Sequence, residues 1–386
     1  MKAVYMDHSA TTPVDPQVFN AMIPYYTDIY GNSSSVHFQG QKAHRALEQA
    51  REQVAALIGA SPGEIIFTAG GTEADNQAII TFMTHEHQKK GKHIITSAIE
   101  HHAVLHTCEF LAKQGFELTV LPVNSYGTIE PDALRAALRP DTALVSIMHA
   151  NNEIGTIEDI KTLAAISHEV GAAFHTDAVQ TVGKIPVNVK ELGVDLLSAS
   201  GHKLYGPKGI GILFVKKGVR ISSYLHGGAH ERNLRAGTVN VPGAVGFGKA
   251  AELAQQRIPQ TTAHLKDLSS HLTSGILNGI SNSRLTGHPE DRLPGSVSVV
   301  FDYVEGESIL LMLDSYGIMA SSGSACTSGS LDPSHVLLAI GLPHETAHGS
   351  LRLTMGKDNT REDVDYVLEK LPPIIKNLRL MSPLGQ

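Results

Sequence analysis

Cysteine is scarce in this sequence, with two residues, Cys108 and Cys326, among 386. Two cysteines cannot build the disulfide framework of a secreted protein, so a reducing, cytoplasmic location is expected. Cys326 lies in a serine-rich stretch, where a free thiol makes more sense than a bridge. Cys108 falls with Val104, Leu111 and Ala112 on the apolar face of an expected helix, which predicts buried packing.

Long apolar runs and long basic runs are also missing. No apolar run approaches the ~20 residues that a membrane helix needs, and the first residues lack the apolar core of a signal peptide. We therefore expect a soluble, unprocessed protein without a membrane partner. The formal net charge of -7, from 38 acidic and 31 basic residues, argues against nucleic acid as the main ligand.

Short apolar runs alternate with helical patterns over the first two thirds of the chain. The apolar spacing of residues 41–58 predicts an amphipathic helix. Strands are expected at residues 64–68, 93–96, 118–121, 143–148, 172–174, 196–198 and 210–215. Such alternation implies an α/β fold with a mainly parallel sheet covered by helices.

The pattern changes after about residue 241. A long polar helical stretch at residues 243–277 is expected to bridge two domains, with Pro259 as a kink or break. Beyond it, strands are expected at 296–301 and 351–354, and helices at 305–316, 334–341 and 361–378. We therefore predict a large domain of residues 14–258 and a smaller α+β domain formed by residues 1–13 and 259–386, the latter carrying the Cys326 loop.

Residues 198–211, SASGHKLYGPKGIG, place Lys203 between small and turn-forming residues. A lysine amine condenses with an aldehyde only when it is deprotonated, and partial burial or cationic neighbours lower its pKa enough to allow this. The stretch therefore suits a lysine that forms a Schiff base. The alternative is a surface lysine before a glycine turn, since Lys208, Lys216 and Lys217 lie nearby.

Upstream, the segment AAFHTDAVQ at residues 172–180 predicts a short apolar strand that ends in Asp177. Strand ends are where α/β sheets build their sites. A carboxylate shortly before a lysine is what pyridoxal phosphate requires, because the lysine holds the aldehyde carbon and the carboxylate keeps the ring nitrogen protonated. The alternative is that Asp177 caps the next helix.

Two further motifs suggest anion binding. In GGTE at residues 70–73, which follows an expected strand and opens a helix, backbone N–H groups and the Thr72 hydroxyl would face a phosphate. The alternative is an ordinary turn with Thr72 as N-cap. In SLRLT at residues 350–354, strand alternation sends Arg352 away from the leucines, which suits either bidentate carboxylate capture or a solvent-facing arginine.

Residues 321–330 contain five serines, two glycines and no large anchoring side chain. This composition predicts a mobile loop, on which the Cys326 thiol could approach a cofactor and swing away. The alternative, an incidental exposed cysteine, is weakened because exposed thiols are prone to oxidation.

With these motifs in hand, the chain resembles the class V aminotransferase group of fold-type I pyridoxal-phosphate enzymes, and within it the cysteine desulfurases. The resemblance runs almost end to end, and the order and spacing of its motifs make it specific. The motifs are DHSATTP (7–13), GNSSS (31–35), GGTEADN (70–76), EHH (100–102), NNEIG (151–155), the lysine segment and SSGSACTS (321–328).

The resemblance implies pyridoxal phosphate as the cofactor and assigns its phosphate group to a set of donors. Gly71 and Thr72 would hold the phosphate, with Ser200 and His202 adding donors. Thr238, in RAGTVN at residues 235–240, matches a threonine that reaches the phosphate of the neighbouring subunit, which implies an obligatory homodimer.

The resemblance also assigns residues around the ring and the substrate. His101 would stack on the pyridine ring and shuttle protons. Asn152 and Gln180 would hydrogen-bond the ring, its phenolic oxygen or the substrate carboxylate, although Asn152 alone could be a turn residue. Arg352 would anchor the substrate carboxylate.

A zinc site is the rival interpretation of the histidines. The candidates are His85, His87, His101 and His102 among 21 histidines, but their grouping matches no usual ligand spacing.

The implied activity is that of an L-cysteine desulfurase. Freed Lys203 would take the Cα proton, Asp177 would keep the ring protonated, and the Cys326 thiolate would attack the substrate sulfur. The products would be L-alanine and a persulfide on Cys326, whose sulfur passes to an iron–sulfur scaffold protein or another thiol acceptor. Cys326 could also briefly share a nascent cluster as an iron ligand. The alternatives are a selenocysteine lyase, a class V aminotransferase, or a catalytically silent scaffold or binding protein.

The sequence departs from the family pattern at two motifs. His8 and Ser9 replace the usual Asn-Asn or Asn-Ala, and Ala229 and His230 stand where Gly-Gln is common. Neither change removes a residue to which we assign a role. The chain also ends soon after Leu380, so we expect a tail used for partner docking to be missing.

Overall fold

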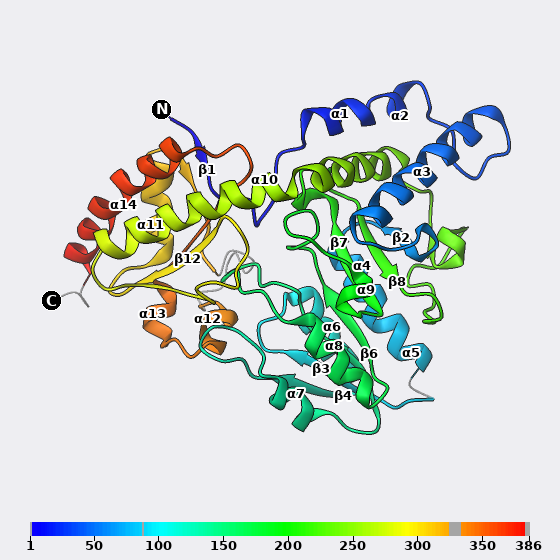
Figure 1. Cartoon of the computed structure of the whole chain (residues 1–386), viewed down its shortest axis with the longest axis horizontal. Helices are drawn as coiled ribbons and strands as arrows, with labels where there is room; N and C mark the ends of the chain where they lie inside the picture. The colour runs from blue at the N-terminus through cyan, green and yellow to red at the C-terminus, as the bar shows by residue number, and fades with distance from the viewer. Residues whose placement is uncertain (1, 87–88, 324–332, 383–386) are drawn as a thin grey trace.

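The computed structural model describes residues 2–86, 89–323 and 333–382. The segments coloured blue to green in Figure 1 form one part of the molecule, around a large sheet, and the yellow to red segments form the other. The long helix α10 (Val241–Gly279) crosses from one part to the other. Strand β1 (Val4–Tyr5) lies with the C-terminal part, because it pairs in parallel with β13 (Ile318–Met319).

The large sheet has seven strands in the order β2-β8-β7-β6-β5-β3-β4. They are β2 Ile65–Thr68, β3 His93–Ser97, β4 Glu117–Leu121, β5 Thr142–Ser146, β6 Ala173–Asp177, β7 Leu196–Ser200 and β8 Gly211–Val215. All neighbouring pairs are parallel except those of β8, which runs antiparallel to both β2 and β7. The expected mainly parallel sheet is therefore confirmed.

Helices cover both faces of this sheet because its strands are apolar on both faces. Alternate residues of β8 show the division: Ile212 and Phe214 pack in one core with α3 (Phe38–Leu57), α8 (Ile160–Glu169) and the first half of α10, and Leu213 and Val215 pack in another with α4 and α6. Helix α4 spans Gly71–Asn76 and helix α6 spans His102–Lys113. The other helices of this part are α1 Pro16–Met22, α2 Pro24–Thr27, α5 Phe82–Glu86, α7 Pro131–Ala137 and α9 Val189–Leu192.

The C-terminal part is built on a smaller antiparallel sheet in the order β11-β12-β14. Its strands are β11 Ser283–Leu285, β12 Ser296–Phe301 and β14 Ser350–Thr354, and its helices are α11 Gly306–Asp314, α12 His335–Ala339, α13 His344–His348 and α14 Arg361–Met381. The strands and helices expected in this region are thus confirmed within a few residues. The domain boundaries that we predict stay a prediction.

Helix α10 corrects one expectation. No break occurs at Pro259, and the helix continues from Val241 to Gly279. Buried residues before Pro259, such as Phe247, belong to the core of the large sheet, and those after it, such as Leu272, belong to the C-terminal core. Pro259 and Gln255 are both exposed, so water can hydrogen-bond the carbonyl group that a proline leaves without its helical partner.

Among the described residues, no helix combines the length and the apolar character that crossing a membrane requires.

Candidate active site

The residues singled out from the sequence converge at the carboxyl ends of the parallel strands, where α/β sheets place their ligands. A cavity of about 330 Å³ opens there. Its lining includes most of the residues predicted to bind cofactor or substrate, namely Gly71, Thr72, His101, Asn152, Asp177, Gln180, Ser200, His202, Lys203 and Arg352. Two predicted residues are not among them: Thr238 is exposed outside the cavity, and Cys326 lies outside the described residues.

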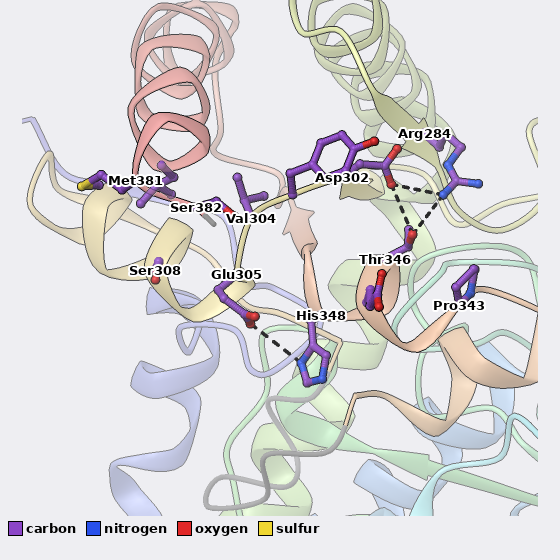
Figure 2. A pocket seen from close by; sticks show the side chains of 13 residues that line it. Arg284, Asp302, Val304, Glu305, Ser308, Pro343, Thr346, His348, Met381 and Ser382 are labelled. Carbon is purple, nitrogen blue, oxygen red and sulfur yellow. Dashed lines mark hydrogen bonds and ion pairs between the residues drawn. The ribbon is translucent and has the colours of Figure 1, made fainter. Parts of the chain in front are cut away.

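A larger cavity, of about 920 Å³, lies in the C-terminal part and includes no residue predicted to be functional (Figure 2). Several of its polar side chains bind one another. Asp302 accepts hydrogen bonds from Arg284 at 3.3 Å and from Thr346 at 3.2 Å, and the His348 ring lies 3.8 Å from a Glu305 carboxylate oxygen. We therefore place the candidate site in the smaller cavity.

Lys203 ends a single 3₁₀ turn, Gly201–Lys203, that directly follows β7. Its side chain is half-buried, and Nζ donates hydrogen bonds to the main-chain carbonyls of Ser9 at 2.5 Å and Ala10 at 2.8 Å. Lys203 is thus held at the cavity wall, as expected of a lysine that reacts with a bound aldehyde. The unusual Ser9 takes part through its main chain, so its side-chain identity does not affect these contacts.

Asp177 is the last residue of β6 and is buried at the cavity. Its Oδ1 accepts a hydrogen bond from the Val179 N–H at 2.8 Å, so it stabilises the local turn as well as lining the cavity. Burial raises the pKa of Asp177 to about 6, and the Lys203 charge opposes this rise. At neutral pH Asp177 is therefore ionised and can hold a proton on a ring nitrogen.

A second carboxyl group, Asp75, lies buried beside Asp177 and was missed in the sequence, although it belongs to the GGTEADN motif. Burial, followed by the Asp177 charge, raises the pKa of Asp75 well above its ordinary value. Its Oδ1 has no hydrogen-bond partner among the described residues and lies 3.6 Å from His175 Nε2. Two close carboxyl groups resist double ionisation, so a protonated Asp75 leaves the negative charge on Asp177.

The start of α4 forms a concave wall at Gly71. A Cβ atom there would lie 2.7 Å from Val179 Cγ2 and 3.7 Å from Ser200 Cβ, so only glycine leaves this space open. The N-cap of α4 is Gly70, and Thr72 is exposed and makes no capping bond, which excludes the alternative role of Thr72 as N-cap. The wall therefore suits an anionic group approaching the backbone N–H groups of a helix start.

His101 is the N-cap residue of α6, and its Nδ1 accepts a hydrogen bond from the Ala103 N–H at 3.1 Å. An accepting Nδ1 carries no proton, so in the neutral ring the proton sits on Nε2. Burial and the Lys203 charge lower the pKa of His101 to about 4. The ring is therefore neutral at pH 7 and can both stack on an aromatic ring and transfer a proton.

Arg352 is buried on β14, while Leu351 and Leu353 face the C-terminal core. Its guanidinium group donates to the Asn152 carbonyl at 3.1 Å and pairs with Asp7 at 3.0 Å, and its buried Nε has no partner in the described part of the chain. A solvent-facing role is thus excluded. Arg352 also lines the cavity, which places its guanidinium group within reach of a second carboxylate there.

The cavity as a whole fits pyridoxal phosphate. Gly71 leaves room for a phosphate at a helix start, Asp177 offers a carboxylate to a ring nitrogen, and Lys203 offers an amine to an aldehyde. In the described ranges, no group of three or more histidine, cysteine or acidic side chains is arranged to hold a metal ion. Cys108 is buried on α6 as expected, and burial raises the pKa of its thiol, so it is not a nucleophile.

Comparisons with known proteins agree with this geometry. The chain is 56% identical over 385 residues to "Cysteine desulfurase IscS" from Methanosarcina thermophila, covering 99% of this chain and 94% of the relative. A solved "NIFS-LIKE PROTEIN" is 40% identical with a TM-score of 0.92 and covers 98% of this chain and 100% of its own. Another structure, "SspA in complex with cysteine", is 36% identical with a TM-score of 0.82, covering 93% and 100%. The model of the family described as "Aminotransferase class-V" matches residues 4–367, and the chain therefore belongs to the class-V aminotransferase family.

Proposed function

We propose that this protein is an L-cysteine desulfurase that uses pyridoxal phosphate. It removes sulfur from L-cysteine, releases L-alanine and leaves the sulfur as a persulfide on Cys326. The observation that carries the proposal is the cavity that brings Lys203, Asp177 and Arg352 together. The relatives support the substrate, since one is named a cysteine desulfurase and another was solved with cysteine.

Pyridoxal phosphate, when bound, supplies an electron sink that makes the α-proton of an attached amino acid acidic. The chain's own residues hold and direct it. Lys203 holds the aldehyde end and, once released, takes the Cα proton. Asp177, ionised at neutral pH, keeps a proton on the ring nitrogen. Neutral His101 covers the ring and moves a proton to or from the substrate.

The anionic ends of cofactor and substrate are bound by separate groups. Gly71, Thr72, Ser200 and His202, which line the cavity near the start of α4 and the end of β7, would hold the phosphate. At the other side, Arg352 binds the α-carboxylate of cysteine, with Asn152 beside it. Asp7 neutralises part of the guanidinium charge, and the substrate carboxylate would meet Arg352 where it lines the cavity.

Sulfur transfer itself requires a nucleophile near the substrate thiol. We assign this role to Cys326, because Cys108 is buried within α6. The Cys326 thiolate attacks the substrate sulfur, the S–S bond forms, and the C–S bond breaks with its electron pair on carbon. Uptake of a proton at that carbon gives alanine, so cysteine and one thiol yield alanine and one persulfide.

Two partners follow from the same proposal. Thr238 is exposed outside the cavity of its own chain, which supports a homodimer in which it reaches the phosphate bound by the partner subunit. The persulfide sulfur passes to an iron–sulfur scaffold protein or another thiol acceptor. During that transfer, Cys326 shares the nascent cluster as a temporary iron ligand.

The test is to incubate the protein, loaded with pyridoxal phosphate, with L-cysteine and no keto acid, and to measure alanine and protein-bound persulfide. We expect equal amounts of both in a single turnover. Cys326→Ala should lose both while retaining the cofactor, and the matched control Cys108→Ala should retain persulfide formation. A requirement for a keto acid would favour an aminotransferase, and persulfide formation by Cys326→Ala would refute the role of Cys326.

A further inference from the structure

We propose that Lys184 positions the Gln180 amide so that its NH₂ group, and not its carbonyl oxygen, faces the ring of the bound cofactor. This inference rests on the proposed function. Lys184 is not one of the cavity-lining residues and carries no role in the mechanism above. It therefore acts through Gln180, as a positioning residue.

The hydrogen bonds around Gln180 fix the orientation of its amide. Lys184 Nζ donates to Gln180 Oε1 at 2.8 Å, and on the other side of the amide lies the Ser9 carbonyl, which only accepts, so the amide nitrogen must face Ser9 and the amide oxygen must face the lysine. The amide nitrogen donates to the Ser9 carbonyl at 3.0 Å, and the same carbonyl accepts the Lys203 ammonium at 2.5 Å. The oxygen of Gln180 is thus turned toward a residue outside the cavity, which leaves its NH₂ group on the cavity side.

The backbone of Lys184 is itself held in place. Its N–H donates to the Thr181 carbonyl at 3.0 Å, and its carbonyl accepts the Thr262 hydroxyl of α10 at 3.3 Å. The side chain therefore starts from a fixed point between the end of β6 and the long helix. A tethered lysine can hold an amide rotamer that a mobile surface lysine could not.

The electrostatic surroundings of Lys184 are mainly positive. Among the residues that the structure describes, no carboxylate forms an ion pair with it, and the charged or titratable groups that it influences are Lys203, Arg352, His8 and His202. Burial, followed by the charges of Lys203 and Arg352, lowers the pKa of Lys184 to about 7. Such a cation is costly unless negative charge binds beside it.

A phenolic oxygen on the cofactor ring would supply that charge in its ionised form. An NH₂ group held toward this oxygen can donate to it but cannot accept from it, so the ionised form is favoured. Replacing Lys184 releases the amide and removes a positive charge. Both effects stabilise the protonated form of the cofactor chromophore, so its pKa should rise.

The experiment is an absorbance titration of the cofactor-loaded protein without substrate. Lys184→Met should raise the pKa of the chromophore by about one unit or more. Lys184→Arg keeps a cationic donor and should recover at least half of that shift. Lys184→Gln is a milder change that keeps a neutral donor, so its chromophore pKa should fall between those of Lys184→Met and Lys184→Arg. If Lys184→Met does not fold, Lys184→Gln serves as the test variant in its place. Lys161→Met, an exposed lysine of α8, is the matched control and should titrate like the wild type.

Gln180→Leu separates positioning from charge alone. If Lys184 acts through Gln180, Lys184→Met should add less than half of its shift in the Gln180→Leu background. A full additive shift, an equal shift in Lys161→Met, or a Lys184→Met protein that titrates like the wild type would each overturn the role of Lys184. A wild-type protein that takes up no pyridoxal phosphate would instead overturn the proposed function and this inference together.

Discussion

The buried pair Arg51–Glu231 provides a sharp test of how the loop before Thr238 is held. Arg51 on α3 donates two hydrogen bonds to Glu231, at 2.7 and 2.8 Å, and the two side chains are only 4% and 2% exposed. Glu231 also accepts the Phe67 N–H of β2 at 2.9 Å. One carboxylate thus joins a helix, a strand and the loop.

Glu231 begins a strained turn, because Glu231, Arg232 and Asn233 all have positive φ angles, of 45°, 57° and 67°. Non-glycine residues adopt this region at a cost of about 1 kcal/mol or more each, so the turn persists only because other contacts determine it. The ion pair with Arg51 supplies such contacts.

Glu231→Gln would leave the buried Arg51 guanidinium with only the Glu48 carboxylate, 3.2 Å from its Nε and 42% exposed, as a counter-charge, and would place an NH₂ group against a donor. Breaking one side of a buried pair costs about 3–5 kcal/mol. Arg51→Met/Glu231→Leu removes both charges and leaves mainly the Phe67 N–H without its acceptor, at about 1–3 kcal/mol. The double variant should therefore be more stable than Glu231→Gln alone.

The assay is equilibrium urea unfolding of the cofactor-free protein, followed by circular dichroism. Glu117→Gln is the matched control, because Glu117 binds Arg139 at the same 2.7 Å distance but its side chain is 61% exposed. That variant should unfold like the wild type, since exposed pairs contribute little. A Glu231→Gln protein as stable as Glu117→Gln, or a double variant less stable than Glu231→Gln, would refute the reasoning.

Three further changes probe the site. Gly71→Ala places a Cβ atom 2.7 Å from Val179 Cγ2 and should weaken pyridoxal-phosphate binding roughly tenfold or more in equilibrium dialysis. Unchanged binding would contradict the role of Gly71 in leaving space for the phosphate. Arg352→Lys replaces a guanidinium group that can bind Asp7 and the substrate carboxylate together by an ammonium group that cannot hold both in the same geometry, so KM for cysteine should rise roughly tenfold. A change confined to kcat would count against carboxylate binding. Burial raises the pKa of Glu100 to about 8, so the folded protein keeps a proton that the unfolded chain releases, and the free energy of unfolding falls as pH rises from about 4.5 to about 8. Glu100→Gln should reduce this fall, as measured by urea unfolding between about pH 5 and about pH 9. An identical decline in both proteins would contradict the prediction.

Local patterns in the sequence predicted the elements and part of the cavity, and the resemblance to a known family added the remaining predicted residues. Strands such as β2 and β12 were visible because their apolar runs are buried on both faces. Asp177 and Lys203 were visible because Asp177 ends such a strand and Lys203 follows another. The helix at residues 243–277 was also predicted, but its continuity across Pro259 was not, because packing of its two halves in different cores keeps it continuous.

Partnerships between distant residues could not be predicted. Asp7 binds Arg352 across 345 positions, and Lys203 binds Ser9 across 194, so no periodicity connects them. The strand pattern left Arg352 as either a carboxylate ligand or a solvent-facing residue, and only the resemblance to a known family favoured the first. Lys184 and Asp75 were missed for the same reason. Asp75 belongs to the GGTEADN motif, but its significance, like that of Lys184, lies in the residues that surround it in the fold.

The most direct test of the account is to locate the covalent bond between protein and cofactor. Reduction of the protein loaded with pyridoxal phosphate, followed by proteolysis and mass spectrometry, should find the cofactor mass on the peptide that contains Lys203, with none on the peptide that contains Lys184. A cofactor bound to any other lysine, or a protein that takes up no pyridoxal phosphate, would contradict the central claim.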